Sequence, residues 1–153
     1  MNKITTRVHI RWMVRKDTQE VLAIEDSLTE SRLISLLRTR NNIGMVATIG
    51  GQIVGLMIYA LHKEKIKLFY LSVHKDYRNQ GVGQQMIDKM KSKLNTERRT
   101  KIEMFVSDFN LRGQLFLKRM GFLCTDIVKG FDDEEDNYIF EHFLNDEEEP
   151  LAF

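Results

Sequence analysis

The sequence predicts an α/β (α+β) fold, with strands and helices in the order β-α-α-β-β-β-α-β-α-β-β. The hydrophobic residues change repeatedly between alternation, which is typical of strands, and a spacing of three to four residues, which is typical of helices. The chain has 153 residues, of which 42% are hydrophobic and 29% charged. This size and composition predict one soluble domain with a sizeable core.

The chain begins with a strand and two helices. Residues 8–14 alternate and predict the strand. Asp17 is expected to cap a helix over residues 20–26, with Glu20 completing a capping box. Thr29 begins the second helix, which ends at the Asn41-Asn42 pair.

A β-hairpin and a third strand follow. Residues 43–49 and 52–61 flank Gly50-Gly51, and glycine supplies the positive φ that a two-residue hairpin turn needs. The next strand covers residues 65–73.

In the second half, helices and strands alternate. An amphipathic helix begins at Gly81, and its apolar face carries Val82, Met86, Met90 and Leu94. Gly121 is expected to end a further helix over residues 110–120 as its C-cap. The remaining strands are predicted over residues 100–107, 122–128 and 137–143.

The junction between the strand at 65–73 and the helix from Gly81 is the most informative segment. Exposed N–H groups at a helix start, with the helix dipole behind them, hold an anion such as a pyrophosphate. Gly81 and Gly83 let the backbone approach such a ligand, because neither carries a Cβ atom. The segment therefore predicts a nucleotide-type cofactor.

Arg78-Asn-Gln-Gly-Val-Gly83 resembles the acetyl-CoA pyrophosphate loop of the GCN5-related N-acetyltransferases (GNAT), Q/R-x-x-G-x-G/A. A dinucleotide fingerprint would need a small residue where Met86 stands. A second family mark is Asn110, followed by a helix and by Met120-Gly-Phe122. The resemblance covers residues 8–143 and implies a mixed central sheet of about seven strands, splayed at the cofactor cleft, with helices on both faces.

The resemblance implies acetyl-CoA as the co-substrate and assigns residues to it. Backbone groups of a splayed strand position the thioester, and the loop holds the pyrophosphate. Asn110 corresponds to a cofactor-side asparagine of the family, although an asparagine helix cap explains it equally well. The implied cofactor-binding residues are Leu71, Ser72, Val73, Arg78, Asn79, Gln80, Gly81, Val82, Gly83 and Asn110.

The segment from Gly130 to Phe140 is similar to a region of enzymes that acetylate protein N-termini, including the ribosomal-protein alanine acetyltransferase. Glu135-Asp136 and Tyr138 match that region. In those enzymes this loop covers the first residues of the peptide, which makes Tyr138 a candidate catalytic or substrate-contacting residue. A buried strand tyrosine with a satisfied hydroxyl is the alternative.

Two side chains that move protons in the family are absent. The position of the tyrosine acid falls on Leu117, and that of the glutamate base falls on Phe105. Glu103 lies on the same strand face as Phe105 and is a candidate base. Tyr70 and Glu25 are further candidates, and the acceptor is expected near Glu25, Tyr70 and Tyr138.

The acceptor class follows partly from acid–base chemistry. General acid–base catalysis contributes about 10²- to 10⁴-fold, so positioning and carbonyl polarisation alone leave a slow enzyme. An α-amino group with a pKa of about 7.7–8.0 is neutral in roughly a tenth to a fifth of molecules at pH 7, against about 0.04% for a lysine amine. A site without a strong base therefore favours a protein N-terminus over lysine.

Other expectations concern organisation and partners. The acetyltransferase domain is expected over residues 1–145, with an acidic tail at 146–153. Cys124 is the only cysteine, no zinc-type spacing occurs, and no apolar stretch is long enough to span a membrane. The N-terminus lacks the apolar core of a signal peptide, so a cytoplasmic enzyme, monomeric or homodimeric, is expected without a metal.

Two alternative functions remain open from the sequence. One is an acetyltransferase whose acceptor is a small amine. The other is an acyl-CoA-binding or scaffold protein that has lost turnover, and Leu117 and Phe105 favour it. Nucleic acid is an unlikely partner because the net charge is only +1, although basic residues gather between Lys89 and Lys101. We expect Lys118, Arg119 and His74 to be surface residues. A contact with the cofactor is the alternative for each of them.

Overall fold

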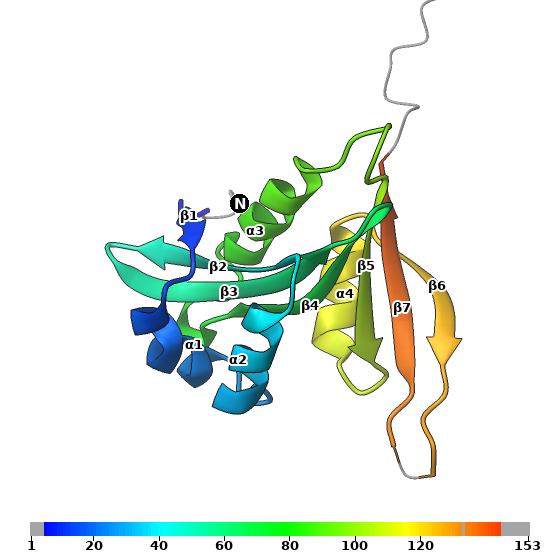
Figure 1. The fold of residues 1–153 in the computed structure, drawn as a ribbon, viewed down its shortest axis with the longest axis horizontal. Coiled ribbons are helices and arrows are strands. Elements are labelled where there is room, and N and C mark those ends of the chain that lie inside the picture. The colour runs from blue at the N-terminus through cyan, green and yellow to red at the C-terminus, as the bar shows by residue number, and fades with distance from the viewer. Residues whose placement is uncertain (1–4, 133, 145–153) are drawn as a thin grey trace, which may run out of the picture. The chain divides into compact units, whose positions relative to one another are not determined.

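The computed structural model describes residues 5–132 and 134–144 and confirms the predicted order of elements. Seven strands form one sheet in the order β1-β2-β3-β4-β5-β7-β6, which confirms the α/β class and the mixed sheet (Figure 1). Two short 3-10 turns are also present: η1 precedes α1, and η2 precedes the loop that leads into α3. The elements are β1 (His9–Trp12), η1 (Arg15–Asp17), α1 (Thr18–Ile24), α2 (Glu30–Arg38), β2 (Asn42–Ile49), β3 (Gln52–Leu61), β4 (Lys65–Val73), η2 (Lys75–Tyr77), α3 (Val82–Lys91), β5 (Lys101–Ser107), α4 (Leu111–Arg119), β6 (Leu123–Val128) and β7 (Asn137–Phe143).

The described residues fall into two compact units. The first comprises residues 5–61 and 68–90, and the second comprises residues 62–67, 91–132 and 134–144. The single domain over residues 1–145 and the splay of the sheet at a cofactor cleft both stay predictions. The acidic tail predicted at 146–153 lies outside the described residues.

The first unit contains an antiparallel β1-β2-β3 sheet. Trp12 pairs with Met45, and Val46 pairs with Leu56. Gly50 and Gly51 have φ values of +56° and +84°, so the predicted glycine turn joins β2 to β3.

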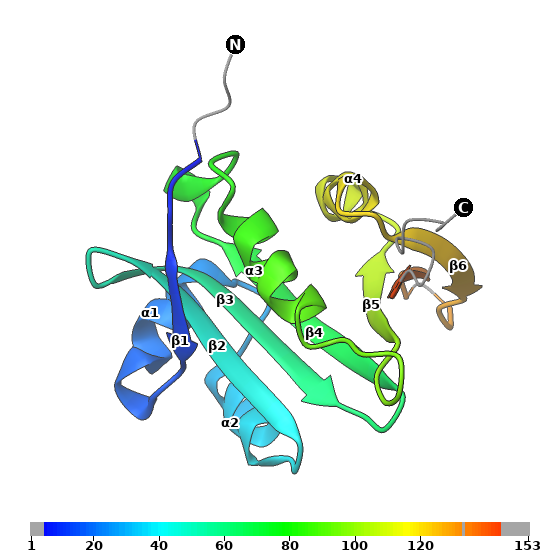
Figure 2. The same cartoon turned by 90° about the horizontal axis from the view of Figure 1, so that it is seen from above.

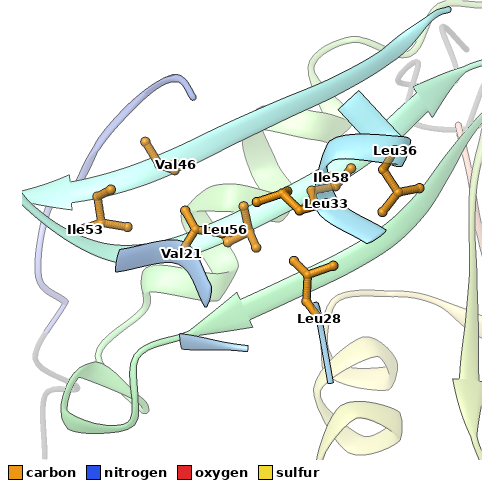
Figure 3. Packing of buried hydrophobic residues seen from close by; sticks show 8 residues of the cluster. All are labelled: Val21, Leu28, Leu33, Leu36, Val46, Ile53, Leu56 and Ile58. Atoms are coloured by element: carbon orange, nitrogen blue, oxygen red, sulfur yellow. The ribbon is translucent and has the colours of Figure 1, made fainter. Parts of the chain in front are cut away.

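Helices cover both faces of this sheet, as the resemblance implied (Figure 2). On one face α1 and α2 pack against β2 and β3 through a cluster of buried aliphatic side chains (Figure 3). On the other face lies α3, where Met86 packs so closely that a Cβ atom at Gly55 would come within 2.7 Å of its sulfur. The cluster consists of Val21, Leu28, Leu33, Leu36, Val46, Ile53, Leu56 and Ile58.

Local hydrogen bonds explain where α2 begins and ends. Thr29 Oγ1 accepts the N–H of Arg32 at 3.2 Å, which confirms the predicted N-cap. At the other end, Asn42 Nδ2 donates to the carbonyl of Leu36 at 2.8 Å, and Asn41 adopts a φ of +71°. The helix itself ends at Arg38 with Thr39 as its C-cap, and the asparagine pair predicted as its end forms the turn that follows.

The predicted capping role of Asp17 is wrong. Its carboxylate makes no capping hydrogen bond to α1. It accepts hydrogen bonds from both terminal nitrogens of Arg11, at 2.8 and 3.0 Å, and from the N–H of Val14 at 2.8 Å. Glu20 does not form a capping box either, because its carboxylate accepts the N–H of Ile53 at 3.3 Å. Asp17 thus fixes η1 to β1, and it is only 3% exposed.

Replacing Asp17 with asparagine should lower the free energy of unfolding by about 2 kcal/mol at neutral pH, because three donors lose a charged acceptor. The hydrogen bonds from Arg11 and, more weakly, from Val14 hold the pKa of Asp17 below its ordinary value despite burial. Its stabilisation is therefore present above about pH 4 and is lost as the pH falls through the lower pKa of the folded state. Urea unfolding of both proteins from neutral to acid pH should show the difference shrinking below about pH 4. A difference that is absent at neutral pH, or that is independent of pH, contradicts this role.

The second unit is built from β5, β7, β6 and α4. β7 pairs antiparallel with β5 on one edge and with β6 on the other. The helix α4 ends at Gly121, which has a φ of +89°, and the N–H of Phe122 donates to the carbonyl of Leu117 at 2.9 Å. This is the glycine C-cap predicted from the sequence.

Candidate functional site

In the first unit, β4 leads through η2 into the loop Arg78–Gly83 and then into α3. Asn79 and Gly81 have φ values of +61° and +81°, so the chain turns sharply before the helix. The N–H of Gln85 donates to the carbonyl of Gly81 at 3.1 Å, which makes Gly81 the residue at which the helical bonding starts. The predicted strand–turn–helix is therefore present.

The geometry of this loop suits an anion. The N–H groups of Val82, Gly83 and Gln84 lie in the first turn of α3 and have no partner within the helix. The helix dipole adds positive potential at the same place. Arg78 is exposed, and its Nε donates to the carbonyl of Val73 at 3.2 Å, which holds the guanidinium beside the turn. These residues fit a pyrophosphate.

The N-terminal segment before β1 supports the loop, which the sequence did not predict. The N–H of Thr6 donates to the carbonyl of Gln80 at 2.8 Å, and the hydroxyl of Thr6 donates to Gln80 Oε1, also at 2.8 Å. Gln85 Nε2 donates to the carbonyl of Thr6 at 2.6 Å, and its oxygen accepts the N–H of Val8. The N-terminal segment thus contacts the middle of the loop at Gln80 and the first turns of α3 at Gln85.

The end of β4 carries a carboxylate partner. Ser72 is 8% exposed, and its hydroxyl donates to Glu25 Oε2 at 2.5 Å. Glu25 follows α1, so the contact joins the α1–α2 connection to the strand segment Leu71–Val73. Tyr70, also on β4, packs against the aliphatic cluster of this unit.

Other residues at the end of β4 serve the turn itself. His74 Nδ1 accepts the N–H of Asp76 at 3.1 Å and caps η2. Tyr77 donates from its hydroxyl to Gln52 Oε1 at 3.1 Å, and Gln80 Nε2 donates to the carbonyl of Asp76 at 3.2 Å. The bond from Asp76 gives His74 a structural role beside the loop, and the other two bonds fix the turn around it.

In the second unit, Asn110 caps α4. Its Oδ1 accepts the N–H of Gly113 at 2.9 Å. A Cβ atom at position 113 would lie 2.6 Å from Asn110 Nδ2, so glycine leaves room for this cap. The capping alternative is confirmed, and the cofactor role of Asn110 stays a prediction.

Glu103 is buried in an ion pair. It is 8% exposed, and both of its oxygens accept from Lys65 Nζ, at 3.1 and 3.0 Å. The pair shows how β5 buries a carboxylate, and the sequence did not predict its partner. The catalytic role of Glu103 stays a prediction.

Phe105 and Leu117 stand where the family has groups that move protons. Phe105 is 40% exposed, and Lys67 Nζ lies 4.8 Å from the centre of its ring. Leu117 is 1% exposed and belongs to the core. Neither apolar side chain can accept or donate a proton.

The β6–β7 connection is fixed to the end of β5. The hydroxyl of Ser107 donates to Glu135, and the N–H of Asp108 donates to the carbonyl of Asp136 at 3.0 Å. The N–H of Gly130 and the ammonium of Lys129 donate to the Asp136 carboxylate and lower its pKa. The matching acidic residues thus shape this connection.

Tyr138 lies in β7, opposite Val106 and Ile127, and is half-buried. Its hydroxyl has no hydrogen-bond partner among residues 5–132 and 134–144, in contrast to the satisfied hydroxyl of the structural alternative. The role of Tyr138 stays a prediction.

Within the part of the chain that the structure describes, no three His, Cys, Asp or Glu side chains are grouped as a metal site. Over the same residues, every helix is too short or too polar to cross a membrane.

Comparisons with known proteins agree with this geometry. The model of an acetyltransferase (GNAT) domain matches residues 40–123, more than half of the chain. This segment includes the loop at Arg78–Gly83 and Asn110.

Solved structures share the fold. The ribosomal-protein-S18-alanine N-acetyltransferase from Escherichia coli matches with 19% identity and a TM-score of 0.78, over 96% of this chain and 100% of its own. Ard1 from Thermoplasma volcanium matches with 21% identity and a TM-score of 0.79, over 90% and 98%. A GNAT family acetyltransferase from Elizabethkingia anophelis with acetyl-CoA bound matches with 18% identity and a TM-score of 0.69, over 90% and 98%.

Proposed function

The chain belongs to the acetyltransferase (GNAT) family, and from this premise we propose that it transfers the acetyl group of acetyl-CoA to the α-amino group of a protein N-terminus. The observation that carries the proposal is the turn at Gly81, which presents the first N–H groups of α3 to an anion. The choice of co-substrate is supported by the structure of a protein with the same fold that has acetyl-CoA bound.

Each part of the chain has a separate task in this proposal. Backbone amides from Asn79 to Gly83 and the side chain of Arg78 hold the pyrophosphate. Backbone groups of Leu71–Val73 orient the thioester. Acetyl-CoA supplies an acyl carbon that accepts an amine and a thiolate that can leave. The protein contributes mainly position, which requires no strong base.

Three arguments support a protein N-terminus as the acceptor. Its α-amino group is neutral far more often at neutral pH than a lysine side chain is. Glu135, Asp136 and Tyr138 match the peptide-covering segment of protein N-terminal acetyltransferases. A protein with the same fold acts on the alanine of ribosomal protein S18.

A second candidate is an acyl-CoA-binding protein without turnover. It is favoured by Leu117, which is buried in the core at the position of the family's tyrosine acid, and by Phe105 at that of the base. Both candidates require acetyl-CoA binding, and only turnover separates them.

The test combines calorimetry with acetyl-CoA and turnover on three acceptors: peptides with a free α-amine, the same peptides with a blocked α-amine and an internal lysine, and small polyamines. We expect binding of acetyl-CoA and kcat/KM values on the order of a few hundred-fold higher on the free α-amine than on lysine, in proportion to the neutral fractions of the two amines. A preference for polyamines would show that the acceptor is a small amine and not a protein N-terminus. Binding of acetyl-CoA without turnover on any amine would support the second candidate. Failure to bind acetyl-CoA overturns the function altogether.

A further inference from the structure

Cationic side chains gather at one end of the second unit. The β3–β4 turn, the segment that leads into β5 and the end of β7 lie together there (Figure 1). Arg99 Nε donates to the carbonyl of His62 at 2.8 Å, and the N–H of Thr100 donates to the carbonyl of Glu64 at 3.1 Å. We call this end the basic surface, and its exposed or half-buried cations are Lys63, Lys93, Arg98 and Arg99.

The cations of the basic surface lack acidic partners. None of the four forms an ion pair with a carboxylate among residues 5–132 and 134–144. Lys65 and Lys101 nearby differ, because each pairs with a buried carboxylate. The same segments carry two exposed carboxylates, Glu64 and Glu97, which leave the positive charge in excess. The surface is therefore suited to an anionic partner.

Hydrogen bonds give this surface a fixed shape. The N–H of Asn95 donates to the carbonyl of Arg99 at 2.9 Å, and the carbonyl of Asn95 accepts the N–H of Arg98 at 3.4 Å. Asn95 Oδ1 also accepts the N–H of Glu97 at 3.1 Å. A closed turn thus presents the two arginines before any partner arrives.

An acidic run of the same chain starts beside the basic surface. The N–H of Leu144 donates to the carbonyl of Thr100 at 2.7 Å, so the residue after β7 is bonded to the segment that carries the cations. Residues 146–149, outside the described residues, read Asp-Glu-Glu-Glu. Since an extended chain spans at most about 3.6 Å per residue, they lie within about 7 to 18 Å of Leu144. These carboxylates cannot move far from the basic surface.

We propose that the acidic run 146–149 binds the basic surface of its own chain and so covers it against other polyanions. Opposite charges supply the attraction, and the short tether gives the run an effective concentration in the millimolar range, with which an anion from solution must compete. Nucleic acid is the alternative occupant, but its phosphates are repelled by the acidic run. The inference does not depend on the proposed function, because it uses no residue of the cofactor or acceptor site.

The direct test compares amide NMR spectra of the wild-type chain with those of a variant whose acidic run is neutral. Exposed ion pairs change stability little, so the spectrum is the readout and unfolding is not. We expect the amide signals of Lys93, Arg98 and Arg99 to shift at low salt and the shifts to vanish at about 1 M salt, where screening acts within about 3 Å. Differences confined to the neighbours of Leu144, or differences that salt leaves unchanged, overturn the inference. The substitutions are Asp146→Asn, Glu147→Gln, Glu148→Gln and Glu149→Gln.

Variants of the basic surface supply the converse experiment. Lys93→Gln with Arg98→Gln removes two of its cations, and neutralising the acidic run in this background should shift the Arg99 amide by about half as much as before, or less. The matched control is Arg112→Gln with Lys118→Gln, which removes the same two kinds of charge from exposed positions on α4 in the same unit. It should leave the effect of the acidic run unchanged. Equal reductions in both pairs would assign the effect to net charge and overturn the inference.

A second readout uses a short single-stranded oligoribonucleotide as the competing polyanion. Neutralising the acidic run should tighten RNA binding roughly tenfold at low salt, because the cations are uncovered. Each phosphate contact adds about 0.7 to the slope of log K against log salt, so four uncovered cations should steepen it by about 3. Equal affinities of the wild type and the variant would show that the run covers nothing. If both bind tightly, the surface belongs to nucleic acid, and the inference is overturned in either case.

Discussion

Introducing glutamate at both Gly81 and Gly83 should weaken acetyl-CoA binding by at least about 100-fold, because several charge-assisted hydrogen bonds are lost together. The two new carboxylates would lie in or beside the first turn of α3, where they compete with pyrophosphate for the same N–H groups and repel it. Gly81 also adopts a φ of +81°, and a Cβ atom there would approach Thr5 within 3.0 Å. Calorimetry with acetyl-CoA and with desacetyl-CoA measures the effect directly.

Backbone strain needs a control of its own. Gly50 likewise has a positive φ of +56°, but a Cβ atom there would have no neighbour within 4 Å. Gly50→Glu therefore imposes a similar conformational cost of about 1–2 kcal/mol in the β2–β3 turn. It should lower stability and leave acetyl-CoA affinity unchanged. Undiminished affinity in the double variant would show that these amides do not hold the cofactor.

The fold was predictable where local chemistry decides it. Gly50-Gly51, Thr29 and Gly121 mark a hairpin turn, a helix start and a helix end, and each acts through groups within a few residues. Asp17 was predicted wrongly for the opposite reason. Its partner Arg11 lies on β1, and a charged side chain there competes better for the carboxylate than the helix N–H groups do.

The site was predictable only where its residues are contiguous. The loop Arg78–Gly83 has the conformation that its glycines indicate. The pairs Thr6–Gln80, Ser72–Glu25 and Lys65–Glu103 join residues 74, 47 and 38 positions apart, and no periodicity or motif reports such contacts. They depend on the packing of strands and helices, which sequence patterns do not specify.

Replacing Lys65 with methionine should lower the free energy of unfolding by about 3 kcal/mol at neutral pH. This is the low end of the range for breaking a buried ion pair, and we choose the low end because the Lys65 side chain is partly exposed. Lys65 neutralises Glu103, and Lys101 Nζ lies 2.5 Å from Glu141 Oε2. Glu103 and Glu141 are cross-strand partners, each 8% exposed. Without Lys65, two buried carboxylates share one cation. Urea unfolding beside Lys63→Met, an exposed lysine in the β3–β4 turn, measures the loss.

The penalty of Lys65→Met should depend on pH in a defined direction. Burial would raise the pKa of Glu141, but hydrogen bonds from Lys101 and Thr125, with the charges of Lys101 and Lys65, hold it below its ordinary value. Stabilisation of this kind is present above about pH 4.3 and is lost as the pH falls through the lower pKa of the folded state. The difference between wild type and variant should therefore narrow in acid. A constant difference would indicate lost packing instead of lost charge.

A second substitution separates the ion pair from catalysis. Lys65→Met combined with Glu103→Leu removes one charge of each sign, and we expect stability within about 1 kcal/mol of wild type, because apolar replacements of a buried pair are often neutral. Glu103→Gln alone then tests the predicted base. A kcat lower by about 10²- to 10⁴-fold, with unchanged acetyl-CoA affinity, would support it. An unchanged kcat would leave Glu103 as a purely structural partner of Lys65, and proton removal would then fall to solvent, as expected when the acceptor is a weakly basic α-amine.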